Sequence, residues 1–289
     1  MDMDNFYSKI LISVLVAGAA LGWGFGASAA TLSLKQGEVL IYPLKNTETE
    51  LSAYLSGEKM PTFKYGGKRY ALLAADVNKK TGSYNLQIKS GTNVLEKKTI
   101  SVKSGTYPKV LKKVPYKFGT LPKAEQETVT KDKAPLVSSL AEAVKTPSPK
   151  LWQSNFINPL MEMKTTSPFG YKRIYTNHST THNGVDLRAG IGTAVYAISD
   201  GKVLWGEQKS LYLEGPMVVI DHGDGIVSKY LHLSKGLVQT GSMVKAGGII
   251  GYSGAEGADV NGAHLHFAIK VRNASVSPLQ FIKEFQKLK

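Results

Sequence analysis

The chain has 289 residues, a formal charge of +14 from 36 basic and 22 acidic side chains, and no cysteine. This length allows two domains that each bury a core, and the lack of cysteine excludes disulfides, thiolate zinc sites and cysteine nucleophiles. The basic surface favours polyanionic partners. Nucleic acid is not expected among them, because the excess charge is mostly scattered lysine without a recognition-helix or aromatic-platform pattern.

Residues 1–30 are predicted to export the chain. An apolar run from Ile10 to Ala27 ends in Ala27-Ser28-Ala29, which has the form of a signal-peptidase site. We expect cleavage after Ala29, because four glycines interrupt the run and small residues crowd its end. An uncleaved membrane anchor is the alternative. Both place the body of the protein outside the cytoplasm, in the periplasm or at the cell wall.

Residues 31–103 are predicted to form an immunoglobulin-like β-sandwich. Short apolar runs alternate with polar residues and are separated by turn residues, which is typical of short paired strands. The runs are Val39–Tyr42, Tyr70–Leu73, Tyr84–Ile88 and Thr99–Val102. This part of the chain contains no histidine and no cluster of charge. It is therefore expected to position the protein without chemistry of its own, or simply to pack on the second domain.

Residues 104–150 are predicted to be a connector. They contain six of the twelve prolines and a strong excess of lysine, and so many prolines prevent one continuous structure. Residues 123–130 and 136–144 have helix-forming composition, and Pro135 suits a first turn, so one or two short helices are expected. An alternative role is a segment that covers a site in the second domain until it is displaced.

Residues 151–289 are predicted to form an antiparallel β domain. Residues 151–278 hold 17 of the 29 glycines of the chain. Short β-prone runs recur between glycine turns, which indicates tight hairpins. Ser277 and Pro278 then precede a closing helix at residues 279–288, with the serine at the N-cap and the proline at the first helical position.

Two histidines, His264 and His266, lie one residue apart in an apolar run of this second domain. In a strand they share one face, about 6 to 7 Å apart, so one can bind a metal while the other faces its open side. The chain has six histidines and none belongs to an HExxH helix, which excludes a zincin-type site. Because cysteine is absent, any metal must be held by histidine and carboxylate.

A second metal-ligand pattern is His182-x-x-x-Asp186. A four-residue spacing could mark one face of a helix, but Gly184 and its β-branched neighbours weigh against a helix. We expect a loop that leads into a strand, with the glycine allowing both side chains to point at one centre.

The remaining histidines are less distinctive when each is taken alone. His232 is expected to share a strand face with Tyr230, and Tyr175 or Tyr230 could line a cleft. His178 is a weak ligand candidate, because the three residues that follow it form a poor helix. His222 belongs to a hairpin turn and is interpreted as structural.

Several motifs follow one another in this domain: Ser167-Pro168-Phe169-Gly170, His182-x-Gly184-x-Asp186-Leu187, Ala197-x-x-Asp200-Gly201-x-Val203, Ile220-Asp221-His222-Gly223, Tyr230-Leu231-His232-Leu233, Val244-x-x-Gly247 and His264-Leu265-His266-Phe267. Together they resemble the lysostaphin-type zinc metallopeptidases, the LytM-domain family of peptidoglycan endopeptidases, over about residues 158–272. The preceding β module resembles the immunoglobulin-like domain of some bacterial members. Ala263 stands where members of this family commonly have proline, and Ala268 stands where they often have a polar residue. These two differences leave the substrate preference open.

The resemblance implies zinc ligands at His182, Asp186 and His266, and catalytic histidines at His232 and His264. Such a site keeps the fourth zinc position open for water. His264 would take the proton from this water, and His232 would orient the water or stabilise the oxyanion. The expected function is an exported zinc-dependent endopeptidase that hydrolyses peptide stems or cross-bridges of bacterial peptidoglycan.

Three other functions compete with this one. A non-catalytic LytM-like regulator, which activates another cell-wall hydrolase, would typically lack some of the five site residues. A zinc D-alanyl-D-alanine dipeptidase or carboxypeptidase usually carries an ExxH element, and no glutamate stands three residues before any histidine. A pure wall-binding module would leave the five residues without a role.

Overall fold

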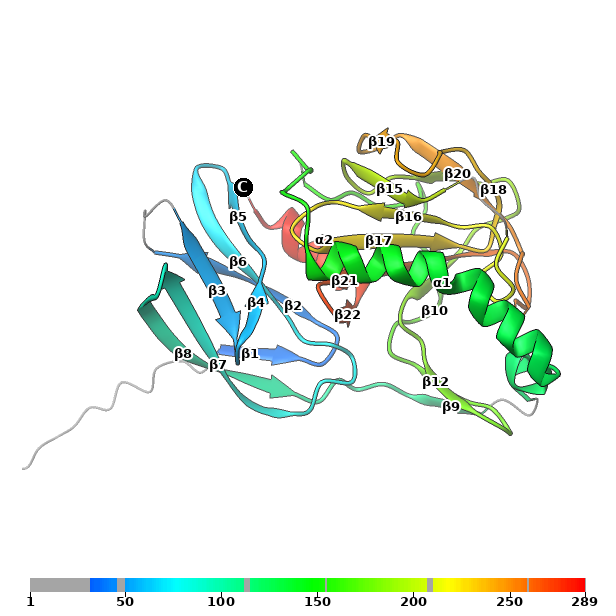
Figure 1. The fold of residues 1–289 in the computed structure, drawn as a ribbon, viewed down its shortest axis with the longest axis horizontal. Coiled ribbons are helices and arrows are strands. Elements are labelled where there is room, and N and C mark those ends of the chain that lie inside the picture. Colours follow the sequence, from blue (N-terminus) through cyan, green and yellow to red (C-terminus); the bar gives the residue numbers. More distant parts are fainter. Residues whose placement is uncertain are drawn as a thin grey trace, which may run out of the picture. The chain divides into compact units, whose positions relative to one another are not determined.

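The computed structural model describes residues 32–45, 50–111, 115–153, 155–206, 210–258 and 260–288 (Figure 1). The expected export segment, residues 1–30, lies outside the described residues. The fold is mainly β, with one long helix in the connector and short helices there and at the end of the described chain. None of the described helices is long and apolar enough to cross a membrane.

The first domain consists of two sheets. Five strands have the order β1 (Leu32–Lys35), β8 (Asn93–Lys103), β7 (Gly82–Ser90), β3 (Leu51–Leu55) and β4 (Glu58–Met60), with β1 parallel to β8. Three strands have the order β2 (Val39–Leu44), β6 (Lys68–Ala74) and β5 (Thr62–Tyr65). Side chains from both sheets, among them Leu73 and Leu86, share one buried core, which is the arrangement of a sandwich. The immunoglobulin-like topology stays a prediction.

The three-stranded sheet is buried on both faces. Successive side chains of a strand point to opposite faces, and in β6 Ala71 and Leu73 enter the core of the sandwich while Leu72 joins the core of the second domain. On that side Phe63 packs against Trp152, with ring centroids 5.1 Å apart, and against Phe285 at 5.6 Å. The first domain therefore packs on the second.

The connector contains β9 (Lys109–Leu111), a 3-10 helix η1 (Lys117–Thr120) and helix α1 (Lys123–Lys145). In place of the one or two short helices that were expected, the connector has one 23-residue helix with Pro135 inside it. An internal proline costs about 3 kcal/mol, but the residues after it form an apolar face. Leu136, Leu140 and Ala143 share one face and belong, as core or neighbours, to a cluster with residues of the large sheet. This packing outweighs the break that Pro135 would cause.

The second domain is built on an antiparallel sheet, as expected. Its strand order is β10 (Thr165–Ser167), β13 (Val185–Arg188), β21 (His264–Val271), β17 (Ile226–Leu231), β16 (Val218–Asp221), β15 (Gly201–Trp205) and β19 (Met243–Val244), with β22 (Ala274–Val276) also paired to β21. The apolar side chains of β13, β17 and β21 form the centre of the core. Two of the three candidate metal ligands, Asp186 and His266, lie on these central strands.

Two smaller sheets complete the second domain. One has the order β14 (Ala194–Tyr196), β20 (Ile249–Ser253) and β18 (Leu233–Gly236), and the other β12 (Ser179–Thr181), β11 (Lys172–Ile174) and the connector strand β9. Helix α2 (Pro278–Gln286) has Ser277 at its N-cap and Pro278 in its first turn, which confirms the prediction for the closing helix.

Candidate metal centre

Strand register brings three of the motifs together. β13 pairs with β21 so that Asp186 lies opposite His266, and β17 pairs with the other edge of β21 so that Leu231, the residue before His232, also lies opposite His266. His264 and His266 occupy the same face of β21 because side chains alternate along a strand. Three segments that are distant in sequence therefore converge on His266.

His182 reaches the same centre from the loop between β12 and β13. Gly184 makes this approach possible, because a Cβ atom at this position would lie 2.5 Å from His266 Nε2 and 2.7 Å from the carbonyl oxygen of Phe267. The glycine is thus required by close packing against His266, in addition to any freedom that it gives the loop.

The three predicted ligands lie within bonding distance of one common point. His182 Nε2 is 2.9 Å from Asp186 Oδ1 and 3.1 Å from His266 Nδ1, and His266 Nδ1 is 2.8 Å from Asp186 Oδ1. Tetrahedral zinc with bonds of about 2.0–2.1 Å has its ligand atoms about 3.3 Å apart. Two imidazole nitrogens and a carboxylate oxygen at these separations fit a zinc ion in both chemistry and size.

The two oxygens of Asp186 have different partners. Oδ1 faces the histidines, whereas Oδ2 accepts a hydrogen bond from Arg173 Nη2 at 2.7 Å. The same guanidinium nitrogen donates to Ser167 Oγ at 3.1 Å. Burial alone would raise the pKa of Asp186, but the adjacent rings of His182 and His266 hold it below its ordinary value. The carboxylate therefore stays ionised.

The sequence interpretation missed Arg173. It lies three residues after the Ser167–Gly170 motif and is one of only four arginines in the chain. That scarcity was the only available signal, because the distance between β11 and Asp186 depends on how the β11–β12 hairpin packs on the large sheet.

Backbone carbonyls fix the protonation of three histidine rings. His182 Nδ1 donates to Pro168 O at 2.9 Å, His232 Nδ1 to Glu256 O at 2.8 Å, and His264 Nδ1 to Gly262 O at 2.9 Å. Because a carbonyl can only accept, each Nδ1 carries the proton. In the neutral rings the lone pair then lies on Nε2, the atom that is free to bind a metal or accept a proton.

The two remaining site histidines lie beside the ligand cluster. The rings of His232 and His264 have centroids 5.0 Å apart, and His264 Nε2 is 3.7 Å from Asp186 Oδ1. Burial, together with the nearby His266 and His264, lowers the pKa of His232 to about 4. The ring of His232 is therefore neutral near pH 7.

The backbone of His232 has a left-handed conformation, with φ +64°. For a residue other than glycine this costs of the order of 1 kcal/mol, and such strain concentrates at functional positions. The N–H of His232 donates to Glu214 O at 3.0 Å, which helps to hold the conformation. The end of β17 is thereby turned so that the ring lies next to His264 and His266.

Three other residues considered in the sequence lie away from this cluster or have other contacts. His222 is fully buried, with Nδ1 donating to Asp200 O and Nε2 2.8 Å from Ser228 Oγ. Tyr230 is also buried and its hydroxyl accepts from Ile198 N–H and Ser228, so it packs in the core and does not line a cleft. His178 stacks on Tyr116 of the connector, with centroids 5.1 Å apart.

The connector touches the loops on two sides of the site. Tyr116 N–H donates to Asn177 Oδ1 at 2.7 Å, in the turn between β11 and β12. The next residue, Lys117, donates to Ala258 O. Ala258 follows Gly257, whose Cβ position lies 3.1 Å from His232 Nδ1. Residues 116 and 117 thus link the β11–β12 turn with the loop beside His232.

Known proteins resemble the second domain in sequence. The sequence pattern of peptidase family M23 matches residues 180–278. Peptidoglycan DD-endopeptidase ShyB of Vibrio cholerae is 41% identical over 117 residues, which are 40% of this chain and 27% of that protein. DD-carboxypeptidase/endopeptidase Mpg of Neisseria meningitidis is 35% identical over 124 residues, or 43% and 28% of the two chains. The chain thus spans little more than a quarter of these curated relatives.

A solved structure is similar over most of the chain. A crystal structure from Pseudomonas aeruginosa assigned to peptidase M23 has a TM-score of 0.67 and 24% identity, over 86% of this chain and 95% of that one. This similarity supports the fold of both domains. Residues 180–278 carry the family pattern and the converging His and Asp side chains. Residues 180–278 therefore match peptidase family M23, and this domain is similar to the lysostaphin-type (LytM-domain) metallopeptidases.

Proposed function

We propose that the protein is an exported zinc-dependent endopeptidase that hydrolyses peptide bonds in bacterial peptidoglycan. The observation that carries the proposal is the convergence of five side chains, His182, Asp186, His232, His264 and His266, from four separate segments on one centre. A structural role would not need three histidine rings that are each oriented through Nδ1 by a backbone carbonyl.

His182, Asp186 and His266 would hold the zinc ion. When bound, zinc supplies Lewis acidity, which lowers the pKa of water toward about 7 and polarises a peptide carbonyl. Three protein ligands are the number found in catalytic zinc sites. Arg173 keeps one oxygen of Asp186 engaged, so that the other oxygen faces the histidines.

His264 is the proposed general base. Its Nδ1 donates to Gly262 O, which leaves the Nε2 lone pair free to take a proton from the attacking water. His232 has the same arrangement through Glu256 O, and its ring lies next to that of His264. We assign His232 to orienting the water or stabilising the oxyanion as the peptide carbonyl is attacked.

The substrate assignment rests on relatives and on charge. ShyB is named as a DD-endopeptidase of peptidoglycan and Mpg as a DD-carboxypeptidase/endopeptidase, which favours a peptide bond between D-residues in the cross-links. The net charge of +14 suits an anionic wall matrix. Residues 1–30 would direct the protein across the cytoplasmic membrane, to the periplasm or the cell wall.

The decisive experiment is release of muropeptides from purified peptidoglycan. We would compare the protein with His264→Ala and with a sample stripped of metal and then restored with zinc. The expected result is release that requires both zinc and His264, with new free amino termini in the products. Stoichiometric zinc binding without release from several wall types would refute the enzyme and favour a regulator of another cell-wall hydrolase.

A further inference from the structure

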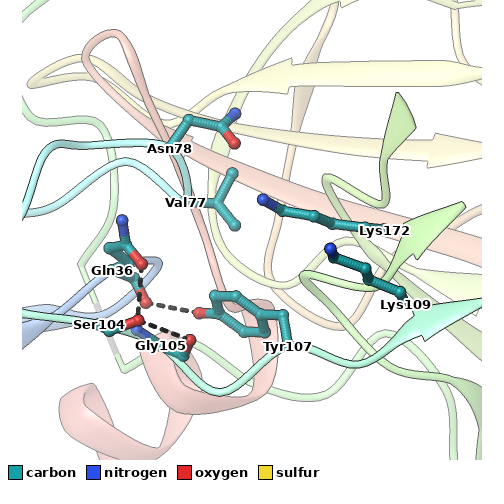
Figure 2. Close-up of a pocket in the computed structure, with 8 residues that line it drawn as sticks. All are labelled: Gln36, Val77, Asn78, Ser104, Gly105, Tyr107, Lys109 and Lys172. Atoms are coloured by element: carbon teal, nitrogen blue, oxygen red, sulfur yellow. Dashed lines mark hydrogen bonds between the residues drawn. The ribbon is translucent and has the colours of Figure 1, made fainter. Parts of the chain in front are cut away.

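A pocket of about 240 Å³ lies where the first domain, the connector and the second domain meet (Figure 2). Val77 and Asn78 line it from the first domain, Tyr107 and Lys109 from the connector, and Lys172 from the second domain. None of its lining residues belongs to the histidine cluster. The pocket is therefore a separate feature of the molecule.

Two lysines from different segments point into this pocket. β9 and β11 pair in parallel with Lys109 directly beside Lys172, and Figure 2 shows both side chains extending from their strands into the pocket. Arg173, the next residue in β11, reaches Asp186 of the metal centre. Because neighbouring side chains of a strand point to opposite faces, Lys172 faces away from that centre.

Within the part of the chain that the structure describes, neither lysine has an acidic partner. Among the described residues, no carboxylate lies within 4.0 Å of either ammonium group. The carboxylate of Asp76, near the pocket in sequence, is engaged elsewhere: its two oxygens accept backbone N–H groups of Asn78 and Ser275, both at 2.8 Å. Like charges side by side on neighbouring strands repel, so the pair would be stabilised by an anion between them.

The remaining wall is held in place by hydrogen bonds. Tyr107 donates through its hydroxyl to Gln36 O, and Gly105 N–H donates to Gln36 Oε1 at 3.1 Å. Val77 is 4% exposed and gives the wall an apolar part, while the side-chain amide of Asn78 offers N–H donors. The volume lies below the roughly 300–1,000 Å³ of pockets for drug-sized ligands. It suits a single charged group with a small apolar neighbour.

We propose that this pocket binds a compact anionic group, a carboxylate or a phosphate, between Lys109 and Lys172. Ammonium groups bind such anions as point charges without a demand for one planar geometry, so both chemistries satisfy the same pair. The carboxylate would come from a peptide of the cell wall and the phosphate from a phosphate-bearing envelope component. Binding here would hold a polymer on the protein at a distance from the metal centre.

The test is a titration of the full protein labelled uniformly with ¹⁵N, at constant ionic strength. Inorganic phosphate is one probe and a soluble disaccharide-peptide from digested peptidoglycan is the other. The backbone amides of Gly105 and Tyr107 report on the pocket, and those around His266 report separately on the metal centre. The variant Lys109→Gln/Lys172→Gln is compared with Lys68→Gln/Lys97→Gln, which removes the same charge from exposed positions of the first domain.

We expect saturable shifts at Gly105 and Tyr107 in the unmodified protein and in Lys68→Gln/Lys97→Gln. In Lys109→Gln/Lys172→Gln the dissociation constant should rise at least tenfold, with unchanged thermal unfolding. If only phosphate saturates the shifts, the natural ligand is a phosphate-bearing envelope component. If the disaccharide-peptide binds more tightly than phosphate, the natural ligand is a carboxylate of a cell-wall peptide. Absence of saturation with both probes, or an equal loss of binding in the two double variants, would overturn the proposal.

Discussion

Arg173 offers a sharp test of how the metal centre is built. Its guanidinium donates to Asp186 Oδ2 at 2.7 Å and is 26% exposed. Hydrogen bonds to charged groups contribute about 1.5–3 kcal/mol, and partial exposure to water favours the lower half of that range. With about 1.4 kcal/mol for each factor of ten, Arg173→Gln should weaken zinc binding about tenfold to thirtyfold.

The physical reason is the orientation of the Asp186 carboxylate. Without the guanidinium, Asp186 Oδ2 loses its partner, the carboxylate can rotate about its Cβ–Cγ bond, and Oδ1 no longer has a single position facing the histidines. Losses of tenfold to a hundredfold are typical when the partner of a metal-ligating group is removed. Arg173→Lys keeps the positive charge but lacks the planar donor group. Its zinc affinity should therefore lie between that of the unmodified protein and that of Arg173→Gln.

Competition with a chromophoric zinc chelator measures this affinity directly, without relying on activity. Arg69→Gln, in the first domain, removes the same side chain away from the centre and serves as the matched control. Zinc affinity in Arg173→Gln equal to that of Arg69→Gln, with both proteins folded, would show that the Arg173–Asp186 contact does not support the site.

Two further predictions concern the rest of the chain. Burial lowers the pKa of His222 to about 4, below the unfolded value of about 6.5. The contribution of neutral His222 to the free energy of unfolding is therefore fully present above pH 6.5 and is lost as the pH falls toward 4. At pH 5 the loss is about 2 kcal/mol. The difference in unfolding free energy between the protein and His222→Gln should narrow by that amount between pH 7 and pH 5 in denaturant titrations. The double variant Tyr116→Ala/Lys117→Ala removes the ring contact of Tyr116 with His178 and the hydrogen bond from Lys117 to Ala258. It should raise the initial rate of peptidoglycan hydrolysis several-fold, and an unchanged or lower rate would assign these contacts a purely structural role.

The sequence was sufficient for features that depend on local periodicity. His264 and His266 share a strand face because side chains alternate, and Ser277-Pro278 begins a helix because of local backbone preferences. The same local reasoning treated Pro135 as a boundary. The helix continues through Pro135 because Leu136 and Ala143 pack against the large sheet. This packing is a tertiary effect that no local pattern contains.

Contacts between segments that are distant in the sequence could not be predicted from local patterns. The pairing of Asp186 with His266 depends on strand register, and the salt bridge from Arg173 depends on how a hairpin packs. The motifs indicated which residues belong to the centre, because each motif combines a ligand with a glycine or an apolar neighbour. They carried no information on the partners that orient these ligands.

The loop at Glu256 shows why such partners escape a search for motifs, and it gives a matched pair of variants. His232 Nδ1 donates to the backbone carbonyl of Glu256, so the side chain of Glu256 has no part in this contact and Glu256→Ala should keep both activity and stability. Gly257 has φ +118°, and a Cβ there would lie 2.5 Å from Leu213 O and 3.1 Å from His232 Nδ1. Gly257→Ala must therefore shift the loop and lose the hydrogen bond.

Loss of that bond frees the His232 ring to rotate and to change its tautomer, which should reduce the rate of hydrolysis tenfold or more while zinc affinity stays unchanged, because His232 is not a proposed ligand. The rate and the zinc affinity of both variants would be measured side by side. A large loss of rate in Glu256→Ala, or none in Gly257→Ala, would mean that the carbonyl contact does not orient His232.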